Sequence, residues 1–476
     1  MDYAVTPARM RALEAEYLAN EGTSSAVLME RAAQGVANVL LGMTPGGALF
    51  LCGPGNNGGD GYAAARLFAD KNRPAQIWTF SDLKALTGDA RENMRRCADM
   101  GISIVQIDDL PENTPAPAGC TAVVDALFGT GLNKPLQGRY AAAVRWINAC
   151  GLPVLAVDMP SGTPELMVRA DATVTFQWKK TPHLLFPGRA NTGALTVCDI
   201  GITATPDASD YWLPTDADIP RLLPPRPLDA HKGLCGHVLA AAGSFGMAGA
   251  AALCAGGALR GGAGLVTVLC PKDTIPMVQT LTPCATCLPW EALPDAAAGK
   301  TCIAAGPGLS RAPFVGAGLA HLLTLPLPQV WDADALNWLA AHPAPLGGRF
   351  ILTPHPGEAA RLLGCATEAI TQDPIAAAEA LSARFGSTVL LKGATTVVIG
   401  DGRRALIASG TPGMATGGSG DVLTGIIAAL LAQKLPPFEA AALGAHLHAQ
   451  AGCLAAARRG VRSMTAMDIL EALRIE

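Results

Sequence analysis

Residues 48–61 read ALFLCGPGNNGGDG, and this stretch decides the fold of the first part of the chain. It joins a continuous apolar run to a segment with five glycines in nine positions, and the helix-forming run YAAARLFAD follows at residues 62–70. A continuous apolar run is typical of a strand covered on both faces of a parallel sheet. Glycines between a strand and a helix leave backbone N–H groups free to contact an anion. The stretch therefore predicts a parallel α/β domain with an anion-binding turn.

Similar apolar runs recur between helical patterns along the whole chain. Ligands of open parallel sheets bind beyond the carboxyl ends of the strands. Titratable side chains and glycines directly follow several of these apolar runs, where the strands would end. They are Asp125 after TAVV, Asp158 after VLAV, Gly306 to Gly308 after CIAA, His355 after FILTP and Lys392 after TVLL. The pattern favours binding sites at these strand ends over simple connecting loops.

A proline-rich stretch, PTDADIPRLLPPRP at residues 214–227, separates the runs into two groups. Proline at this density excludes both a helix interior and a central strand. The length of 476 residues suits two or three domains. We therefore expect an α/β domain at residues 1–215, a linker at residues 216–227 and a second α/β domain at residues 228–476.

Composition argues against several classes of function. The chain has 35 basic and 39 acidic residues, a net charge of -4, which disfavours binding to nucleic acid or to an anionic membrane surface. The first twenty residues lack the apolar core of a secretory signal, and the apolar stretches are too short or too interrupted to span a bilayer. The thirteen cysteines are an odd number spread along the chain, which is typical of free thiols in a reducing compartment. We expect a cytoplasmic protein.

The first group of strand ends carries polar side chains suited to proton transfer and to cation binding. Asp158 could move a proton at a reacting carbon. Asn57, Asp125 and Ser161 together supply hard oxygen donors with little net charge, which suits a monovalent cation better than zinc. A second glycine-containing loop at Gly129–Pro135 carries one cation and could close over a phosphate. A plain turn at residues 53–61 is the structural alternative.

The second group centres on residues 416–421, TGGSGD, which precede the apolar run VLTGIIAALLAQ. The glycines deliver free N–H groups to a helix start, and Asp421 lies in the first turn, where it could act as a base toward a hydroxyl. An Asp that only caps a buried helix is the alternative. His355 lies between two prolines that fix its backbone, with Glu358 beside it, so a substrate contact and a purely structural histidine both fit.

The motifs GPGNNGGDG and VVDALFGTGL and the loop from Asp158 to Gly162 resemble the NAD(P)H-hydrate epimerase family over roughly the first 200 residues. The resemblance implies a Rossmann-like three-layer domain, a potassium ion at Asn57, Asp125 and Ser161, and a lysine, Lys179, near the substrate. The substrate-binding residues that it implies are Asn56, Asn57, Gly58, Gly59, Asp60, Gly129, Thr130, Gly131, Leu132, Asn133, Lys134, Pro135 and Asp158.

Downstream, AAGPGLS, WDADALN, LTPHPGEAARLL, LLKGATTVV and GGSGDVLTG resemble, in this order, the ADP-dependent NAD(P)H-hydrate dehydratase family, which has a ribokinase-like α/β fold. The resemblance implies that Ala263, Gly308, His355 and Asp421 contact the hydrate. The nucleotide contacts that it implies are Lys392, Gly393, Ala394, Thr395, Thr396 and Gly420.

Both resemblances together imply a bifunctional enzyme that repairs hydrated NADH and NADPH, called NADHX and NADPHX. The first domain would interconvert the R and S hydrates through Asp158. The second would use ADP and Mg²⁺ to phosphorylate the hydroxyl of the S hydrate, with Asp421 as base, and then expel phosphate. The family resemblance also implies that the protein is a homo-oligomer.

The alternative is a ribokinase-like kinase of a small molecule with a non-catalytic, ligand-binding first domain. The segment after Ser161 and Gly162, TPELMVRADATVTF, is shorter than is usual in the epimerase family, which favours this alternative for the first domain.

Overall fold

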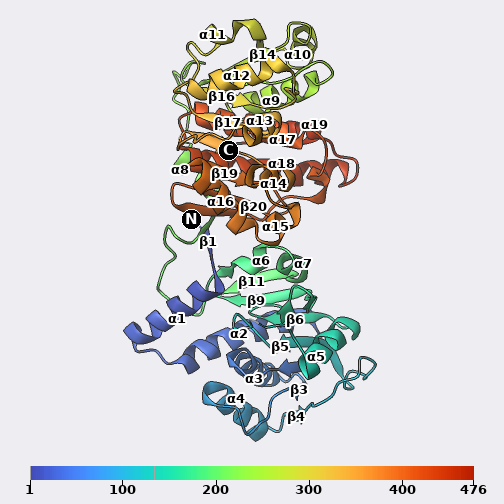
Figure 1. Cartoon of the computed structure of the whole chain (residues 1–476). Coiled ribbons are helices and arrows are strands. Elements are labelled where there is room, and N and C mark those ends of the chain that lie inside the picture. The colour runs from blue at the N-terminus through green and yellow to red at the C-terminus, as the bar shows by residue number, and fades with distance from the viewer. Residues whose placement is uncertain (1, 133, 224, 476) are drawn as a thin grey trace. The chain divides into compact units, whose positions relative to one another are not determined.

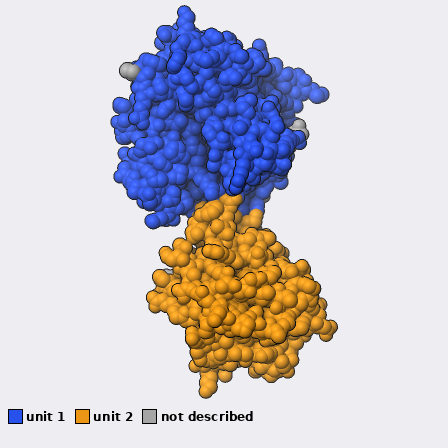
Figure 2. All heavy atoms as spheres, turned by 90° about the vertical axis from the view of Figure 1, so that its right-hand side faces the viewer, with its two compact units in different colours: residues 1–2, 208–476 blue, residues 3–207 orange. Residues whose placement is uncertain are grey.

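The computed structural model describes residues 2–132, 134–223 and 225–475. The chain divides into two compact units, one spanning Tyr3–Asp207 and one that begins at Ala208 (Figure 2). Part of the stretch expected to be a linker forms two short helical turns, η1 (Asp216–Asp218) and α8 (Ile219–Leu222). None of the described helices has both the length and the apolar character needed to cross a bilayer.

The first unit is built on a parallel sheet in the order β11-β9-β6-β5-β2-β3-β4 (Figure 1). The order reverses between β2 and β5, so the loops after these two strands diverge and leave a crevice where ligands bind in such sheets. The strands are β2 (Gly47–Cys52), β3 (Ala75–Thr79), β4 (Ser103–Gln106), β5 (Cys120–Ala126), β6 (Val154–Val157), β9 (Ala172–Phe176) and β11 (Ala194–Cys198).

Helices cover both faces of this sheet, as the continuous apolar runs predict. Every residue of β2 is buried: Phe50 packs in one core cluster with α2 and α3, whereas Leu49 and Leu51 pack in the other cluster with α5. The Rossmann-like three-layer fold is therefore confirmed. The helices are α1 (Pro7–Glu21), α2 (Ser25–Met43), α3 (Asn56–Ala69), α4 (Gly88–Asp99), α5 (Gly138–Ala149), α6 (Thr181–Leu184) and α7 (Gly188–Asn191).

Two short pairings complete the description of this unit's strands. β1 (Asp2–Val5) pairs in parallel with β10 (Lys179–Lys180). The short segment after Ser161 folds into a small hairpin of β7 (Gly162–Thr163) and β8 (Leu166–Met167), so this loop is ordered close to the strand ends.

The second unit has a sheet in the order β12-β21-β20-β19-β18-β17-β16-β13-β14-β15. The strands from β19 to β15 run in parallel, and β20 with β21 forms an antiparallel extension. The strands are β12 (Tyr211–Leu213), β13 (His237–Ala241), β14 (Leu265–Cys270), β15 (Thr286–Pro289), β16 (Cys302–Ala305), β17 (Gln329–Trp331), β18 (Phe350–Leu352), β19 (Thr388–Leu391), β20 (Thr396–Gly400) and β21 (Arg403–Ile407).

The position of α17 (Ser419–Ala432) decides where the second site forms. From Val422 onward its residues are buried against α9 (Ala248–Arg260) and the sheet. Gly425 permits the close approach of the two helices, because a Cβ there would lie 2.0 Å from the carbonyl oxygen of Cys254. The remaining helices are α10 (Ile275–Leu281), η2 (Trp290–Ala292), α11 (Leu293–Ala296), α12 (Pro313–Thr324), α13 (Ala333–Ala341), α14 (Pro356–Leu363), α15 (Thr367–Gln372), α16 (Pro374–Phe385), η3 (Pro412–Met414), α18 (Pro437–Arg459) and α19 (Ala466–Ala472).

Candidate functional sites

The first site lies at the carboxyl ends of β5, β6 and β9, around the buried carboxylate of Asp158. Lys180 Nζ donates to Asp158 Oδ1 over 2.8 Å, and Thr175 Oγ1 donates to the same oxygen over 3.0 Å. Burial acts to raise the pKa of Asp158, but the charge and hydrogen bond of Lys180 outweigh it, so the pKa lies below its ordinary value. The other oxygen lies toward Gly129, where a Cβ would be 3.2 Å from Oδ2. Asp158 is thus an ionised carboxylate with one oxygen facing the loop Gly129–Pro135, which is called the substrate loop because the family resemblance implies that it contacts the substrate.

The backbone of Asp158 is held in a conformation unusual for a residue other than glycine, with φ at 63°. His183 supports it: the backbone N–H of Lys180 donates to His183 Nδ1 over 3.0 Å, so Nε2 carries the proton and donates to the carbonyl oxygen of Asp158 over 2.8 Å. Burial and the nearby Lys180 charge lower the pKa of His183 to about 4. His183 is therefore a neutral support for Asp158.

Asp125 and Ser161 form a buried pair next to this carboxylate. Asp125 accepts from the backbone N–H of Ser161 over 2.7 Å and from its hydroxyl over 2.7 Å. Burial raises the pKa of Asp125 to about 6, with these hydrogen bonds acting in the opposite direction. Asn57, the third residue of the predicted cation set, is also buried, and its Nδ2 has no hydrogen-bond partner among the described residues. One carboxylate, one hydroxyl and the amide oxygen of Asn57, which lies toward Gly129, are hard oxygen donors that fit a monovalent cation.

Two more carboxyl groups, Asp60 and Glu14, surround the site. Burial raises the pKa of Asp60 well above its ordinary value, and Asp158 and Glu14 add to the shift. Burial also raises the pKa of Glu14, again with a contribution from Asp158. Glu14 lies on α1, which is tied to the substrate loop because Arg11 donates to the carbonyl oxygen of Thr130 over 2.8 Å. The site thus combines an ionised Asp158 with Asp60, whose carboxyl group is shifted strongly toward its protonated form, and a pair of carboxyl groups with pKa values moved apart is the arrangement needed for acid and base at one pH.

The predicted substrate residues of the first unit fall on two segments. Residues 56–60 form the first turn of α3, directly after β2, and residues 129–135 follow β5. The structure brings Asn57, Gly129 and Asp158 together, since a Cβ at Gly129 would also lie 3.0 Å from Asn57 Oδ1. Asn133 lies outside the described residues.

Lys180, which sequence reasoning did not single out, is the lysine that pairs with Asp158. Lys179 is the residue expected near the substrate, but Lys180 carries the ion pair with Asp158, and its side chain is 1% exposed. Both lysines belong to the short strand β10, so the alternation of side chains along a strand places neighbours on opposite faces. The signal available in the sequence was the KK pair itself, which does not show which lysine faces inward.

The second site lies at the start of α17. Gly418 caps the helix with φ at 90°, and Asp421 lies in the first turn. Burial, together with the negative charges of Asp332 and Asp334, raises the pKa of Asp421 to about 7 against the opposing charge of Lys392. Among the described residues, no side chain donates a hydrogen bond to the Asp421 carboxylate. This carboxyl group is therefore positioned as a proton acceptor near neutral pH.

Asp332 connects the ends of β17 and β19 to the start of α17 through hydrogen bonds. It follows β17 and accepts from Lys392 Nζ over 2.7 Å and from Thr424 Oγ1 over 2.9 Å. Thr424 also donates to the carbonyl oxygen of Gly420 over 3.0 Å, and a Cβ at Gly420 would lie 3.4 Å from Lys392 Nζ. The predicted nucleotide residues Lys392 and Gly420 are thus adjacent, and Asp332, which was not singled out from the sequence, joins them.

The other predicted nucleotide residues extend from Lys392 along the β19–β20 hairpin. Residues 392–395 form the turn between these strands, and Thr396 begins β20. The stretch KGATT is therefore the turn of an antiparallel hairpin. Because Lys392 Nζ also lies 3.9 Å from Glu358 Oε2, its charge is shared between two buried carboxyl groups.

His355 caps α14 at the same edge of the sheet. Its Nδ1 accepts from the N–H of Gly357 over 3.0 Å, and its own N–H donates to Glu358 Oε2 over 2.8 Å. Burial and the charge of Lys392 lower the pKa of His355, so its ring is neutral near pH 7. Gly308 follows β16 at this edge, with φ at 60°.

Ala263 does not lie with Asp421, His355 and Lys392 at the second site. It lies between α9 and β14, and the adjacent Gly264 donates to the carbonyl oxygen of Gly236 at the amino end of β13. The far end of α17 reaches this region, since Gln433 donates to the carbonyl oxygen of Gly261 over 3.0 Å. Ala263 therefore lies beside the later turns of α17, whereas Asp421 lies in its first turn.

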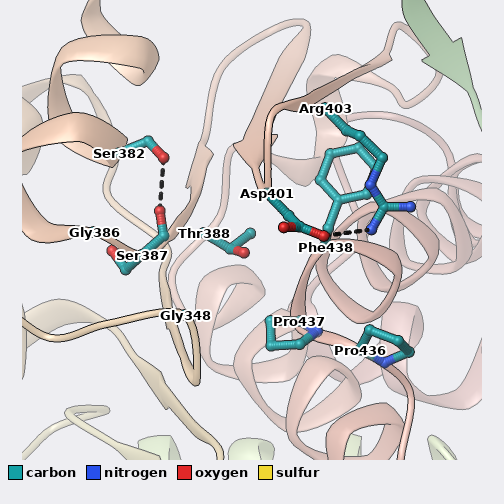
Figure 3. A pocket seen from close by; sticks show the side chains of 10 residues that line it. All are labelled: Gly348, Ser382, Gly386, Ser387, Thr388, Asp401, Arg403, Pro436, Pro437 and Phe438. Carbon is teal, nitrogen blue, oxygen red and sulfur yellow. Dashed lines mark hydrogen bonds and ion pairs between the residues drawn. The ribbon is translucent and has the colours of Figure 1, made fainter. Parts of the chain in front are cut away.

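A hollow of about 480 Å³ in the second unit lies away from the second site (Figure 3). Its lining includes Gly348, Thr388 and Asp401, which are at the amino ends of β18 and β19 and at the β20–β21 turn. Arg403 there is engaged by Glu439 over 2.6 Å. Asp421, His355 and Lys392 lie at the opposite, carboxyl ends of the strands, so this hollow does not belong to their site.

Both units thus define a class of protein: a two-domain α/β enzyme with a glycine-rich helix start and a carboxyl group of shifted pKa in each domain. Family models agree with this division. The model described as NAD(P)H-hydrate dehydratase matches residues 238–474, and the model described as YjeF-related protein N-terminus matches residues 25–182.

Curated relatives match almost the whole chain. The bifunctional NAD(P)H-hydrate repair enzyme of Moorella thermoacetica is 38% identical over 510 residues, covering 99% of this chain and 96% of that protein. The enzyme of the same name from Vibrio cholerae is 36% identical, covering 94% of this chain and 92% of that protein.

Solved structures match the second domain. The ADP/ATP-dependent NAD(P)H-hydrate dehydratase from Bacillus subtilis, co-crystallised with ATP and Mg²⁺, is 31% identical with a TM-score of 0.50, covering 55% of this chain and 95% of that one. A ribokinase-like superfamily protein from Enterococcus faecalis is 25% identical with a TM-score of 0.51, covering 57% of this chain and 96% of that one. The ribokinase-like fold is therefore confirmed.

The chain belongs to the family of bifunctional NAD(P)H-hydrate repair enzymes, with an epimerase domain followed by an ADP-dependent dehydratase domain. The predicted family and both predicted activities are confirmed. The full-length matches do not favour the alternative of a small-molecule kinase with a non-catalytic first domain.

Proposed function

We propose that the second domain dehydrates the S hydrate through a phosphorylated intermediate, with Asp421 as the base. The observation that carries this proposal is the start of α17, where backbone N–H groups of a glycine-rich turn lie beside a buried carboxyl group with a pKa of about 7. A base with a pKa near the working pH is both ionised often enough and basic enough to accept a hydroxyl proton.

In the first step of this proposal, Asp421 takes the proton of the C6 hydroxyl, and that oxygen attacks the terminal phosphorus of ADP. The bond from this phosphorus to its bridging oxygen breaks, and AMP leaves. In the second step the C6–O bond breaks, phosphate departs with the electron pair, the ring nitrogen supplies electrons, and a proton is lost from C5. One hydrate and one ADP thus give one reduced nucleotide, one AMP and one phosphate. The N–H groups at Gly417–Gly420 would stabilise the charge on the phosphoryl group in transfer.

The nucleotide and Mg²⁺ are supported by the Bacillus subtilis dehydratase, which was co-crystallised with ATP and Mg²⁺. Mg²⁺ supplies charge neutralisation to the transferred phosphoryl group and is usually held by substrate phosphates and one or two carboxylates. Of the carboxylates at the second site, Asp332 has both oxygens occupied by Lys392 and Thr424. Asp334 Oδ2 accepts from the N–H of Ser310 over 2.8 Å, whereas its Oδ1 has only a long 3.5 Å contact from Asn337, so Oδ1 of Asp334 is the oxygen that would approach the ion.

We also propose that the first domain interconverts the R and S hydrates at the crevice around Asp158. Inversion at C6 requires that the bond between C6 and the ring nitrogen break while the C6 hydroxyl loses its proton and the nitrogen gains one, and that the bond then re-form on the other face of the resulting aldehyde. A proton acceptor and a proton donor near this carbon are therefore needed. The ionised Asp158 provides the acceptor, and Asp60, whose pKa burial raises well above the ordinary value, provides the donor. A potassium ion held by Asn57, Asp125 and Ser161 would supply a fixed positive charge beside the substrate.

One assay tests both proposals. Purified protein is incubated with separated R or S hydrate, with ADP or ATP, and the absorbance of reduced nicotinamide is followed. Asp421→Ala should abolish recovery from both epimers, whereas Asp158→Ala should stall recovery from R and leave recovery from S normal. Near-normal turnover of Asp421→Ala, or equal loss from both epimers in Asp158→Ala, would contradict the respective assignment.

The free thiols favour a reducing compartment as the place of action. All thirteen cysteines lie among the described residues, and each is unpaired there. We propose a cytoplasmic location, together with a homo-oligomeric state that rests on the family resemblance and that sedimentation analysis would test.

A further inference from the structure

A hollow of about 410 Å³ opens beside the substrate loop of the first domain. Its size lies within the range of roughly 300–1,000 Å³ found for small-molecule pockets. Four of its lining residues are not among the substrate-binding residues that the family resemblance implies. The lining residues are Phe128, Leu132, Lys134, Pro135, Leu136, Gln137 and Tyr140.

Two aromatic rings form the wall of this pocket. Phe128 and Tyr140 meet edge to face, with ring centroids 4.9 Å apart, and both are partly buried against the core cluster on the α5 face of the sheet. The backbone of Phe128 is fixed by Ser161: its N–H donates to Ser161 Oγ over 2.9 Å, and its carbonyl oxygen accepts from this hydroxyl over 3.0 Å. The wall is therefore held by the same residue that binds Asp125. A preformed slot of aromatic and aliphatic side chains suits a planar heterocyclic base.

The rim of the pocket is polar. Lys134 is exposed, and among the described residues no carboxylate forms an ion pair with it. Gln137 adds an amide that can donate to and accept from the edge of a base. A cation and an amide around an apolar floor match a nucleotide, which has a base at one end and phosphate charge beside it.

The position of the pocket relative to the reacting groups connects it to the substrate. Phe128 lines the pocket, and the next residue, Gly129, lies against Asn57 and Asp158. A dinucleotide that presents its nicotinamide ring to Asp158 has its second half tethered through the pyrophosphate. Leu132, Lys134 and Pro135, a few positions further along the chain, also line the pocket.

We propose that this pocket binds the adenine nucleotide end of the hydrated dinucleotide, with the base against Phe128 and Tyr140 and phosphate charge at Lys134. The inference rests on the proposed epimerase function of the first domain. The phosphate at Lys134 is either the pyrophosphate, present in both hydrates, or the 2′-phosphate, present only in hydrated NADPH.

The test compares whole and truncated substrates. Interconversion of R and S hydrates is measured by chromatography, without ADP, for hydrated NADH, hydrated NADPH and hydrated reduced nicotinamide mononucleotide, which lacks the adenosine half. Loss of a stacked base costs roughly tenfold or more in binding. Tyr140→Ala should therefore raise KM at least tenfold for both dinucleotides, with a much smaller change for the mononucleotide. Equal losses with all three substrates, or no change with any, would overturn the proposal.

Lys134→Met distinguishes the two phosphates, and Lys71→Met, an exposed lysine after the carboxyl end of α3, is its matched control. A rise in KM for hydrated NADPH alone assigns Lys134 to the 2′-phosphate, and an equal rise for both dinucleotides assigns it to the pyrophosphate. No rise for either contradicts the contact with Lys134. Leu132→Arg, which fills the pocket without removing a core ring, should reproduce the Tyr140→Ala pattern if that variant folds poorly.

A readout independent of activity separates this proposal from the proposed function. An 8-azidoadenine analogue of NADP⁺ is photocrosslinked to the full chain, and labelled peptides are identified by mass spectrometry. Labelling within residues 128–140, reduced in Leu132→Arg, supports the pocket even if the protein shows no epimerase activity. Labelling confined to other segments refutes it.

Discussion

The pKa of Asp421 predicts a steep pH dependence for the dehydratase reaction. Since a base must be ionised to accept the hydroxyl proton, the rate should follow the ionised fraction of a carboxyl group with a pKa of about 7. This fraction is about 0.1 at pH 6 and about 0.9 at pH 8, so the rate at pH 8 should exceed that at pH 6 roughly tenfold. Asp332 contributes to the high pKa through its negative charge. In Asp332→Asn the same rise should therefore occur at lower pH.

The assay is the initial rate of NADH recovery from S hydrate at saturating ADP and Mg²⁺, between pH 5.5 and 8.5. ADP itself titrates in part of this range, and the variant distinguishes the two causes. A titrating nucleotide has the same midpoint with either protein, whereas a titrating Asp421 gives a lower midpoint with Asp332→Asn. An identical midpoint for both proteins would refute the assignment of the profile to Asp421.

Three further variants test the buried charges. Asp421 keeps a proton in the folded protein between pH 3.8 and about 7 that the unfolded chain releases, so stability falls as pH rises through this window. Asp421→Asn should be more stable than the parent by ~2–4 kcal/mol at pH 8 and about equal to it at pH 4 in urea unfolding. Lys180→Met leaves the buried carboxylate of Asp158 unpaired and should destabilise the first domain by about 3–5 kcal/mol, well beyond the effect of Lys179→Met. Gly129→Ala places a methyl group 3.2 Å from Asp158 Oδ2. It should slow recovery of reduced nucleotide from the R hydrate at least tenfold and leave recovery from the S hydrate unchanged. Equal recovery from both epimers would contradict this prediction.

The strand ends were predictable because they depend on local pattern. A continuous apolar run such as residues 48–52 must be covered on both faces, and its carboxyl end must then meet the other strand ends at one edge. Asp125, Asp158, His355 and Lys392 all lie at such ends, as the sequence predicts.

The partners of these residues were not predictable in the same way. Lys180 reaches Asp158 from a two-residue strand, and Asp332 reaches Lys392 across 60 positions of the chain. Neither contact has a periodic signal, because each depends on which strands become neighbours and not on spacing along one element. The placement of Ala263 shows the same limit, since a residue implied by resemblance can fold to the far end of a helix.

These unpredicted partners, Lys180 and Asp332, determine the protonation of the aspartate in each site. Both domains place an aspartate near a lysine, yet the two aspartates differ in protonation. In the first domain Lys180 bonds directly to Asp158 and holds its pKa down. In the second domain the ammonium group of Lys392 is bonded to Asp332, so Asp421 feels burial and a neighbouring negative charge more strongly than the lysine. The same two residue types therefore give a permanently ionised carboxylate in one site and a base that titrates near neutral pH in the other, because the hydrogen-bond partner of the lysine differs.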